Sequence, residues 1–221
     1  VEDLKANEFL ILKSAENPSA SALARFKAGQ GLVPVQVQHK PWGVKALNVQ
    51  QRFALDLLMD KDISLVTLIG VPGSGKTLLA LAAGLEQVLN EHAYRRMLVA
   101  RPVIPVGHDI GFLPGTKQEK LNTWMGAIYD NLEFLMERPQ KEESRLDIQM
   151  LMDDGKLEIE AVTLLRGRTL PGQYIIIDDA QNLTPHEIKT IISRAGQGAK
   201  IVLTGDPHQV DNYYLDAGSN G

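Results

Sequence analysis

The chain has 221 residues with a formal net charge of −4, and 44% of the residues are hydrophobic, which is ordinary for a folded globular domain. It has no cysteine, so disulfides, zinc sites with thiolate ligands and a cysteine nucleophile are excluded. No apolar run approaches the roughly 18 residues of a bilayer span, and acidic Glu2 and Asp3 do not fit a signal peptide, so we expect a cytoplasmic protein with no membrane partner.

The first 45 residues are richer in strand and turn signals than the rest of the chain. Residues 8–12 are expected to form a short strand, residues 17–19 a turn, and residues 22–37 a small β-hairpin. Large apolar residues are too few here for a separate core. We therefore expect an N-terminal β-rich arm over residues 1–45 and one α/β domain over residues 46–221.

From residue 46 onward, strand-like apolar runs alternate with helical patterns. Strands are expected at residues 64–69, 97–100, 157–164, 174–177 and 200–204, and helices at residues 49–59, 76–89, 117–136 and 184–194. Strands separated by helices favour an α/β fold in which a parallel sheet has helices on both faces. Such sheets bind ligands beyond the carboxyl ends of their strands, so the candidate site is formed by the loops after Ile69, Ala100, Ile177 and Thr204.

The loop after Ile69 carries the most specific motif in the chain. Residues 70–77 are GVPGSGKT, which fits the phosphate-loop pattern G-x-x-x-x-G-K-[ST] between an apolar strand and a helix. The glycines let backbone N–H groups point at a polyphosphate, Lys76 brings a positive charge to it, and the Thr77 hydroxyl is suited to ligate Mg²⁺. A chance match occurs in about one chain in a hundred of this size, so we predict that ATP and Mg²⁺ bind here. The predicted nucleotide-binding residues of the loop are Val71, Pro72, Gly73, Ser74, Gly75, Lys76, Thr77 and Leu78.

A second candidate loop begins where an apolar strand ends in two carboxylates, Asp178 and Asp179. The first acid would hold magnesium together with Thr77, and the second would orient the attacking water. An exposed acidic turn is the alternative, and the phosphate loop upstream favours the catalytic interpretation. After the next apolar strand, the Gln209 amide would sense the γ-phosphate, although an ordinary Gly-Asp-Pro turn also explains that loop.

Several segments resemble the PhoH-like proteins. They are YIIIDDAQNLTPHEIKT at residues 174–190, KIVLTGDPHQVDN at 200–212, RPVIPVGHDIGFLPG at 101–115 and LLRGRT at 164–169. The resemblance extends from about residue 7 to the last residue. It implies a RecA-like P-loop NTPase fold related to superfamily one helicases, ATP hydrolysis, single-stranded RNA as a partner and ring-shaped homo-oligomers.

The FLPG sequence and the N-terminal arm are most similar to the form in which PhoH follows a PIN ribonuclease domain. This sequence has no such domain, and a start at Val1 rather than Met fits its having been left off. The resemblance therefore implies a natural protein that couples the ATPase to a ribonuclease.

The resemblance also implies roles for residues outside the phosphate loop. Asn48 and Gln51 would recognise the adenine edge, and Arg101 would lie on a substrate path or near the phosphates. Arg166 and Arg168 would be candidates to reach a γ-phosphate, including that of a neighbouring subunit. The predicted catalytic set is Lys76, Asp178, Asp179, Gln209, Arg166 and Arg168, with Thr77 and Asp178 as metal ligands.

One position departs from the family pattern, which usually has Asp-Glu where this chain has Asp178 and Asp179. Asp is one methylene shorter, and misplacing a catalytic group by about 1 Å can cost on the order of a hundredfold in rate. Two functions therefore stay open. The first is an ATPase that drives RNA remodelling or unwinding in a homo-oligomer, and the second is a slow ATP-gated assembly or regulatory module with little turnover.

Simpler explanations account for other polar and aromatic residues. The apolar stripe on residues 117–136, which includes Trp124, is more often core or subunit interface than a base-stacking surface. Lys117 and Lys120 on the same helix are more often solvated than bound to phosphate. Residues 136–147 are expected to form a solvated connector.

Overall fold

The structure, a computed structural model, describes residues 3–17, 19–36, 39–103, 117–137, 147–212, 215–216 and 218–221. In the helix that begins at residue 117, side chains are described from residue 124 onward. The expectations for the segment 104–115, for the Lys117 and Lys120 side chains and for the connector over residues 138–146 lie outside the described residues.

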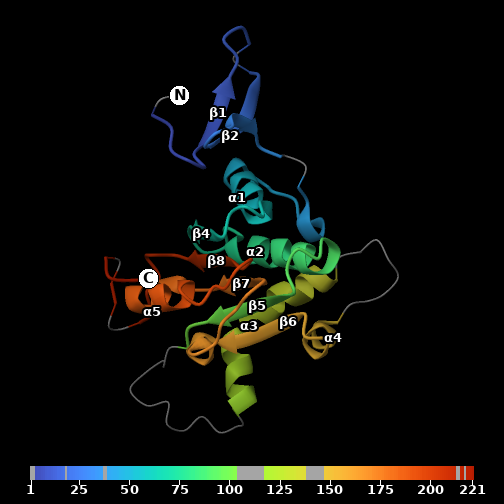
Figure 1. The fold of residues 1–221 in the computed structure, drawn as a ribbon, viewed down its shortest axis with the longest axis vertical. Coiled ribbons are helices and arrows are strands. Elements are labelled where there is room, and N and C mark those ends of the chain that lie inside the picture. The colour runs from blue at the N-terminus through green and yellow to red at the C-terminus, as the bar shows by residue number, and fades with distance from the viewer. Residues whose placement is uncertain are drawn as a thin grey trace.

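A small antiparallel sheet forms the N-terminal arm. Its strands, in spatial order, are β1 (Phe9–Lys13), β2 (Ser21–Lys27) and β3 (Gly31–Pro34). The sheet stands on helix α1 (Val49–Met59) at one end of the molecule (Figure 1). The Phe9 ring stacks on Phe53 of α1 with 4.3 Å between centroids, and the buried Arg25 pairs with Asp56 and Asp60. The arm therefore shares apolar and ionic contacts with the rest of the chain.

The main sheet has five parallel strands, as the alternation of strands and helices predicts. Their spatial order is β4 (Leu65–Ile69), β8 (Lys200–Gly205), β7 (Gln173–Ile177), β5 (Arg96–Arg101) and β6 (Leu157–Ala161). The strand expected at residues 157–164 ends already at Ala161, because the chain turns there into the short 3-10 helix η3 (Val162–Leu165). Val162 and Leu165 are buried in that helix, so their apolar character continues the core and not the strand.

Alternate residues of a strand point to opposite faces of the sheet, so each strand contributes to a core on either face, and helices cover both. Met97 and Val99 of β5 pack in one core with helices α1, α2 (Lys76–Leu85) and α3 (Lys117–Met136). Leu98 and Ala100 belong to a second core with α5 (Pro185–Ile192). The α/β fold class with an N-terminal β arm is confirmed.

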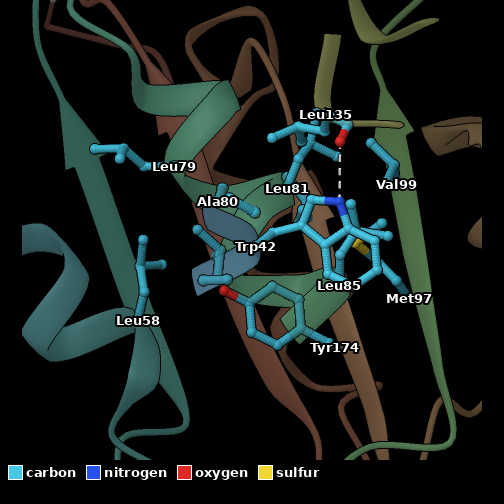
Figure 2. Packing of buried hydrophobic residues seen from close by; sticks show 14 of the residues in the cluster. Trp42, Leu58, Leu79, Ala80, Leu81, Leu85, Met97, Val99, Leu135 and Tyr174 are labelled. Atoms are coloured by element: carbon cyan, nitrogen blue, oxygen red, sulfur yellow. Dashed lines mark hydrogen bonds between the residues drawn. The ribbon is translucent and has the colours of Figure 1, made fainter. Parts of the chain in front are cut away.

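The first core is closely packed around Trp42 (Figure 2). The Trp42 indole Nε1 donates to the carbonyl oxygen of Leu135 in α3 at 3.1 Å. A Cβ on Gly84 of α2 would lie 2.5 Å from Met97 Sδ, so only glycine lets this helix lie so close to the sheet. The phosphate-loop helix is thereby held firmly on the strands that carry the other candidate residues.

Two helical details differ from the pattern-based expectation, and a third agrees with it. The helix expected at 76–89 changes into a π-helical turn, η2 (Glu86–Asn90), and a short helix α4 (Ile148–Asp153) was not predicted. Helix α5 begins with a capping box, in which Thr184 and Glu187 exchange hydrogen bonds as the Thr184-Pro185 signal suggests. Within the described residues, none of the helices is long and apolar enough to cross a bilayer.

Candidate nucleotide-binding site

Four neighbouring strands bring the predicted loops to one edge of the sheet. In the parallel pairing, Ile69 lies beside Gly205, and Ile177 lies beside both Leu203 and Ala100. The strands β4, β8, β7 and β5 therefore end together, and their four loops meet there. This is the edge at which parallel α/β sheets bind ligands.

The phosphate loop has a backbone shape that its glycines make possible. Gly73 and Gly75 have φ angles of 72° and 87°, in the left-handed region that costs other residues energy. Helix α2 begins directly after Gly75, so its first N–H groups and the positive end of its dipole face the loop. The Lys76 Nζ lies inside the loop and donates to the carbonyl oxygens of Gly70 at 2.6 Å and Val71 at 2.9 Å.

Asp178 is a buried carboxylate held by hydroxyl groups from two other elements. Its Oδ1 accepts from the Thr77 hydroxyl at 2.7 Å and from the Thr204 hydroxyl at 2.6 Å. Burial raises the pKa of Asp178 and the neighbouring Asp179 raises it further, whereas the two hydroxyl bonds lower it. Thr77 and Asp178 offer hard oxygen atoms side by side, which is the donor type that Mg²⁺ prefers.

Asp179 has an unusual backbone and an ionic partner. Its φ and ψ of 52° and 42° are left-handed, which few residues other than glycine adopt. Its Oδ2 pairs with Arg101 Nη2, and Arg101 Nη1 donates to the Trp124 carbonyl oxygen of α3 at 3.4 Å. The acid that is predicted to orient water is therefore joined through Arg101 to helix α3.

Asn48 and Gln51, predicted to recognise adenine, lie at the start of α1. The Asn48 side chain caps the helix by accepting from the Gln51 N–H at 2.8 Å. The Gln51 amide accepts from the Leu47 N–H at 2.7 Å and donates to the Ser74 carbonyl oxygen at 3.0 Å. Gln51 thus fixes the start of α1 against the phosphate loop.

The loop after β8 is bound to the acidic loop by side chains that the motifs did not single out. Gln181 Nε2 donates to the Gln209 carbonyl oxygen at 3.1 Å, and Gln181 Oε1 accepts from the Asp206 N–H at 3.2 Å. Asn182 Oδ1 accepts from the Asp211 N–H at 2.8 Å. The Gln209 side chain is exposed. Its role as a γ-phosphate sensor stays a prediction.

Arg166 and Arg168 lie beyond β6, at the other end of the sheet from β4. Arg168 pairs with Glu158 at 2.7 Å and Glu160 at 2.9 Å, and these carboxylates raise its pKa. Arg166 is 69% exposed and makes a longer pair of 3.3 Å with Glu187. The structure therefore gathers the predicted lysine, threonine and two acids but leaves these two arginines apart from them.

Thr204, Arg101 as the partner of Asp179, and Gln181 are the site residues that the motifs did not reveal. In the sequence, Thr204 is marked only as a polar residue at the end of an apolar strand. The contacts of all three depend on which strands are neighbours in space, and spacing along the chain does not reveal this.

Comparison with known proteins gives a consistent picture over nearly the whole chain. A family model described as "PhoH-like protein" matches residues 43–220. The "Protein PhoH2" of Bacillus subtilis is 51% identical over 217 residues, which cover 97% of this chain and 48% of that protein. The "Protein PhoH2" of Mycolicibacterium smegmatis is 38% identical over 195 residues, which cover 88% of this chain and 43% of that protein.

Among the relatives, the "PhoH-like protein" of Synechocystis is 36% identical over 168 residues, covering 76% of this chain and 48% of that protein. The chain thus spans about half the length of the curated relatives that it matches.

Among solved structures, the Sulfolobus solfataricus SWI2/SNF2 ATPase core in complex with dsDNA aligns with a TM-score of 0.49 and 18% identity, over 81% of this chain and 36% of that one.

Proposed function

The chain belongs to the PhoH-like protein family, and from this premise we propose that it binds Mg-ATP at the phosphate loop and hydrolyses it. The single observation that supports this most is the contact between the Thr77 hydroxyl and the Asp178 carboxylate at 2.7 Å. These residues are 101 positions apart, and the fold places them together beside a lysine in a glycine-rich loop. Chance motifs in unrelated loops would have no reason to meet in this way.

Each residue would have a distinct task in the reaction. Backbone N–H groups of residues 73–78 and the Lys76 ammonium would hold the phosphates and neutralise charge that develops on the γ-phosphate. Thr77 and Asp178 would hold Mg²⁺, which supplies charge stabilisation when bound. Asp179 would orient the attacking water, and Asn48 and Gln51 would contact the adenine.

The broader function that we propose is work on RNA. ATP hydrolysis would drive remodelling or unwinding of single-stranded RNA in a homo-oligomer, coupled to a PIN ribonuclease domain of a longer chain. The family resemblance supports this proposal, as does the position of Arg101 at the same sheet edge as the phosphate loop.

The contact between Arg101 and Asp179 favours the second candidate function, a slow ATP-gated module. An acid that is paired with an arginine is less available to a water molecule, and Asp is shorter than the usual Glu. In this case ATP would control assembly or a partner interface, and turnover would be small.

Steady-state ATP hydrolysis, with and without single-stranded RNA, tests the proposal. Lys76→Ala should reduce turnover at least about a hundredfold, because it removes a charge that acts directly on the phosphates. Lys61→Ala is the matched control, since Lys61 is an exposed lysine paired with Glu91 away from the loop, and it should keep full turnover.

Turnover that survives Lys76→Ala would contradict hydrolysis at this loop. Tight ATP binding by the unaltered chain with negligible turnover, with RNA as well as without it, would instead support the slow ATP-gated module.

A further inference from the structure

We propose that Arg101 is a positioning residue that restrains Asp179 in a closed ion pair, and that a phosphate group competing for the guanidinium releases Asp179 to orient the attacking water. The proposal rests on the proposed function and adds a control of the same site. Its consequence is that ATP turnover is held below what the site can reach for as long as the ion pair stays closed.

The position of the pair links it directly to the metal-binding acid. Arg101 is the last residue of β5, and Asp179 is the second residue after β7, the strand paired with β5. The Asp178 N–H donates to the Ala100 carbonyl oxygen at 2.9 Å, so the two strand ends are joined by the backbone next to the ion pair. A change at Arg101 therefore acts on Asp179, the residue next to Asp178, which is the proposed metal ligand.

The backbone of Asp179 indicates that this arrangement is held by its surroundings. Left-handed φ and ψ values are costly for a residue with a side chain, and they persist where neighbouring contacts impose them. Two described contacts do so here: the ion pair with Arg101, and the hydrogen bond from the Asn182 N–H to the Asp179 carbonyl oxygen at 3.0 Å. Loss of the ion pair removes one of these two contacts and frees the Asp179 carboxylate.

The competing group is a phosphate because of what Arg101 presents. A guanidinium binds phosphate oxygens in the same forked geometry as it binds a carboxylate. The Arg101 side chain is 26% exposed and that of Asp179 is 28% exposed, so a ligand at the sheet edge can approach both. The Trp124 carbonyl oxygen accepts from Nη1 and so keeps the guanidinium in place.

Two ligands could supply this phosphate at the sheet edge: the γ-phosphate of the bound nucleotide, or the phosphodiester backbone of a single-stranded nucleic acid. Both would compete with Asp179 for the same guanidinium. An ion pair that is partly exposed to water shifts such an equilibrium by only about two- to fivefold, which sets the size of the expected effect.

The test measures kcat and KM for ATP of the unaltered chain and of Arg101→Gln, each with and without poly(U) RNA. Without RNA, Arg101→Gln should raise kcat about two- to fivefold and leave KM unchanged, because the released Asp179 acts on the water and not on ATP binding. Arg101→Lys keeps a positive charge and should restore part of the restraint. Thermal unfolding of each variant checks that the fold is kept.

Arg96→Gln is the matched control. Arg96 lies on the same strand, is 29% exposed and pairs with Glu158 at 2.9 Å, but it is at the opposite end of β5. Its substitution should change neither kcat nor the response to RNA.

If poly(U) raises kcat of the unaltered chain but not of Arg101→Gln, the releasing phosphate belongs to the nucleic acid. If Arg101→Gln raises kcat and poly(U) changes neither protein, the γ-phosphate is the releasing group. A kcat equal to or below that of the unaltered chain would overturn the restraint, because Arg101 would then support Asp179 or have no effect on it. Adding Lys76→Ala to both backgrounds separates the proposals, since turnover that persists there contradicts hydrolysis at the phosphate loop.

Discussion

Asp178 and its two hydroxyl partners show what a single residue contributes to the site. Burial makes its charged form unfavourable, and its pKa is accordingly raised, so a nearby divalent cation would gain a strong interaction with it. Thr77 was foreseen because it has a fixed place in the phosphate-loop motif. Thr204 was not, because it has no fixed spacing to Asp178 and reaches it only because β8 lies between β4 and β7.

Lys200 is a second buried charge, and it gives a prediction about stability and pH. Its side chain has 0% exposure, and its Nζ donates to the carbonyl oxygens of Leu57 and Asp60 at the end of α1. Burial lowers its pKa from 10.5 to about 8. Because the unfolded chain holds this proton more tightly than the folded chain, the free energy of unfolding should rise by about 1.5 kcal/mol between pH 8 and 9.5. Chemical denaturation across that range measures the effect.

Lys200→Met provides the comparison, because methionine keeps much of the buried stem and has no proton to lose. The variant should lack the rise, and the difference between the two proteins isolates Lys200 from the tyrosines that titrate at higher pH. An identical rise in both proteins would show that another group is responsible.

At the scale of elements, the sequence predicts the long and strongly patterned segments best. The bounds of α1 and α3 match the expected residues 49–59 and 117–136 because apolar spacing and end signals agree there. The prediction for β6 runs three residues too far, because buried Val162 and Leu165 extend the apolar pattern past the end of strand pairing. Short α4 was missed, since six residues give too little periodicity.

The candidate site was predicted as a set of loops but not as a set of contacts. Motifs identified the phosphate loop and the two acids, and parallel-sheet topology explains why they meet. The Arg101 pair with Asp179 and the Arg168 pairs on β6 could not be foreseen, because they depend on strand order. A parallel sheet leaves several strand orders open to the same sequence of elements.

Asp60 at the end of α1 gives a prediction about the N-terminal arm. Burial alone would raise the pKa of its carboxyl, but hydrogen bonds from Lys27 and Arg25 outweigh this and bring the pKa to about 2. Relative to an unfolded value of 3.8, this adds about 2 kcal/mol above pH 4, which is lost as the pH falls towards 2. Asp60→Asn should therefore lower stability by about 2 kcal/mol at pH 7 and speed hydrogen exchange in β1 and β2.

Asp62→Asn is the control, because Asp62 is an exposed acid two residues away. It should leave exchange in β1 and β2 unchanged. If Asp60→Asn also leaves it unchanged, the stacking of Phe9 on Phe53 holds the arm without help from the ion pairs.

At the scale of the whole molecule, the order of the strands separates the phosphate loop from the candidate arginine residues. Strand β4 is at one edge of the described sheet and β6 is at the other, four strand spacings away, or roughly 19 Å. Arg166 and Arg168 follow β6, and their described ion pairs are with Glu187, Glu158 and Glu160 and not with the phosphate loop of their own chain. Of the two, Arg166 is the freer, because Arg168 is held by two carboxylates.

An arginine that does not contact the phosphate loop of its own chain can act on a neighbouring copy, because head-to-tail contacts in a ring place one edge of a subunit against a different edge of the next. Arg166→Ala should then lose most of its ATP turnover, as should Lys76→Ala, because each lacks one half of a shared site. An equal mixture of the two should regain about a quarter of full turnover, since that share of random neighbours pairs an intact loop with an intact arginine. Arg95→Ala, which alters an exposed arginine one residue before β5, should behave like the unaltered chain. A mixture no more active than its separate components would show that Arg166 does not complete the phosphate loop of a neighbouring copy, and full turnover in Arg166→Ala alone would place this arginine outside the reaction.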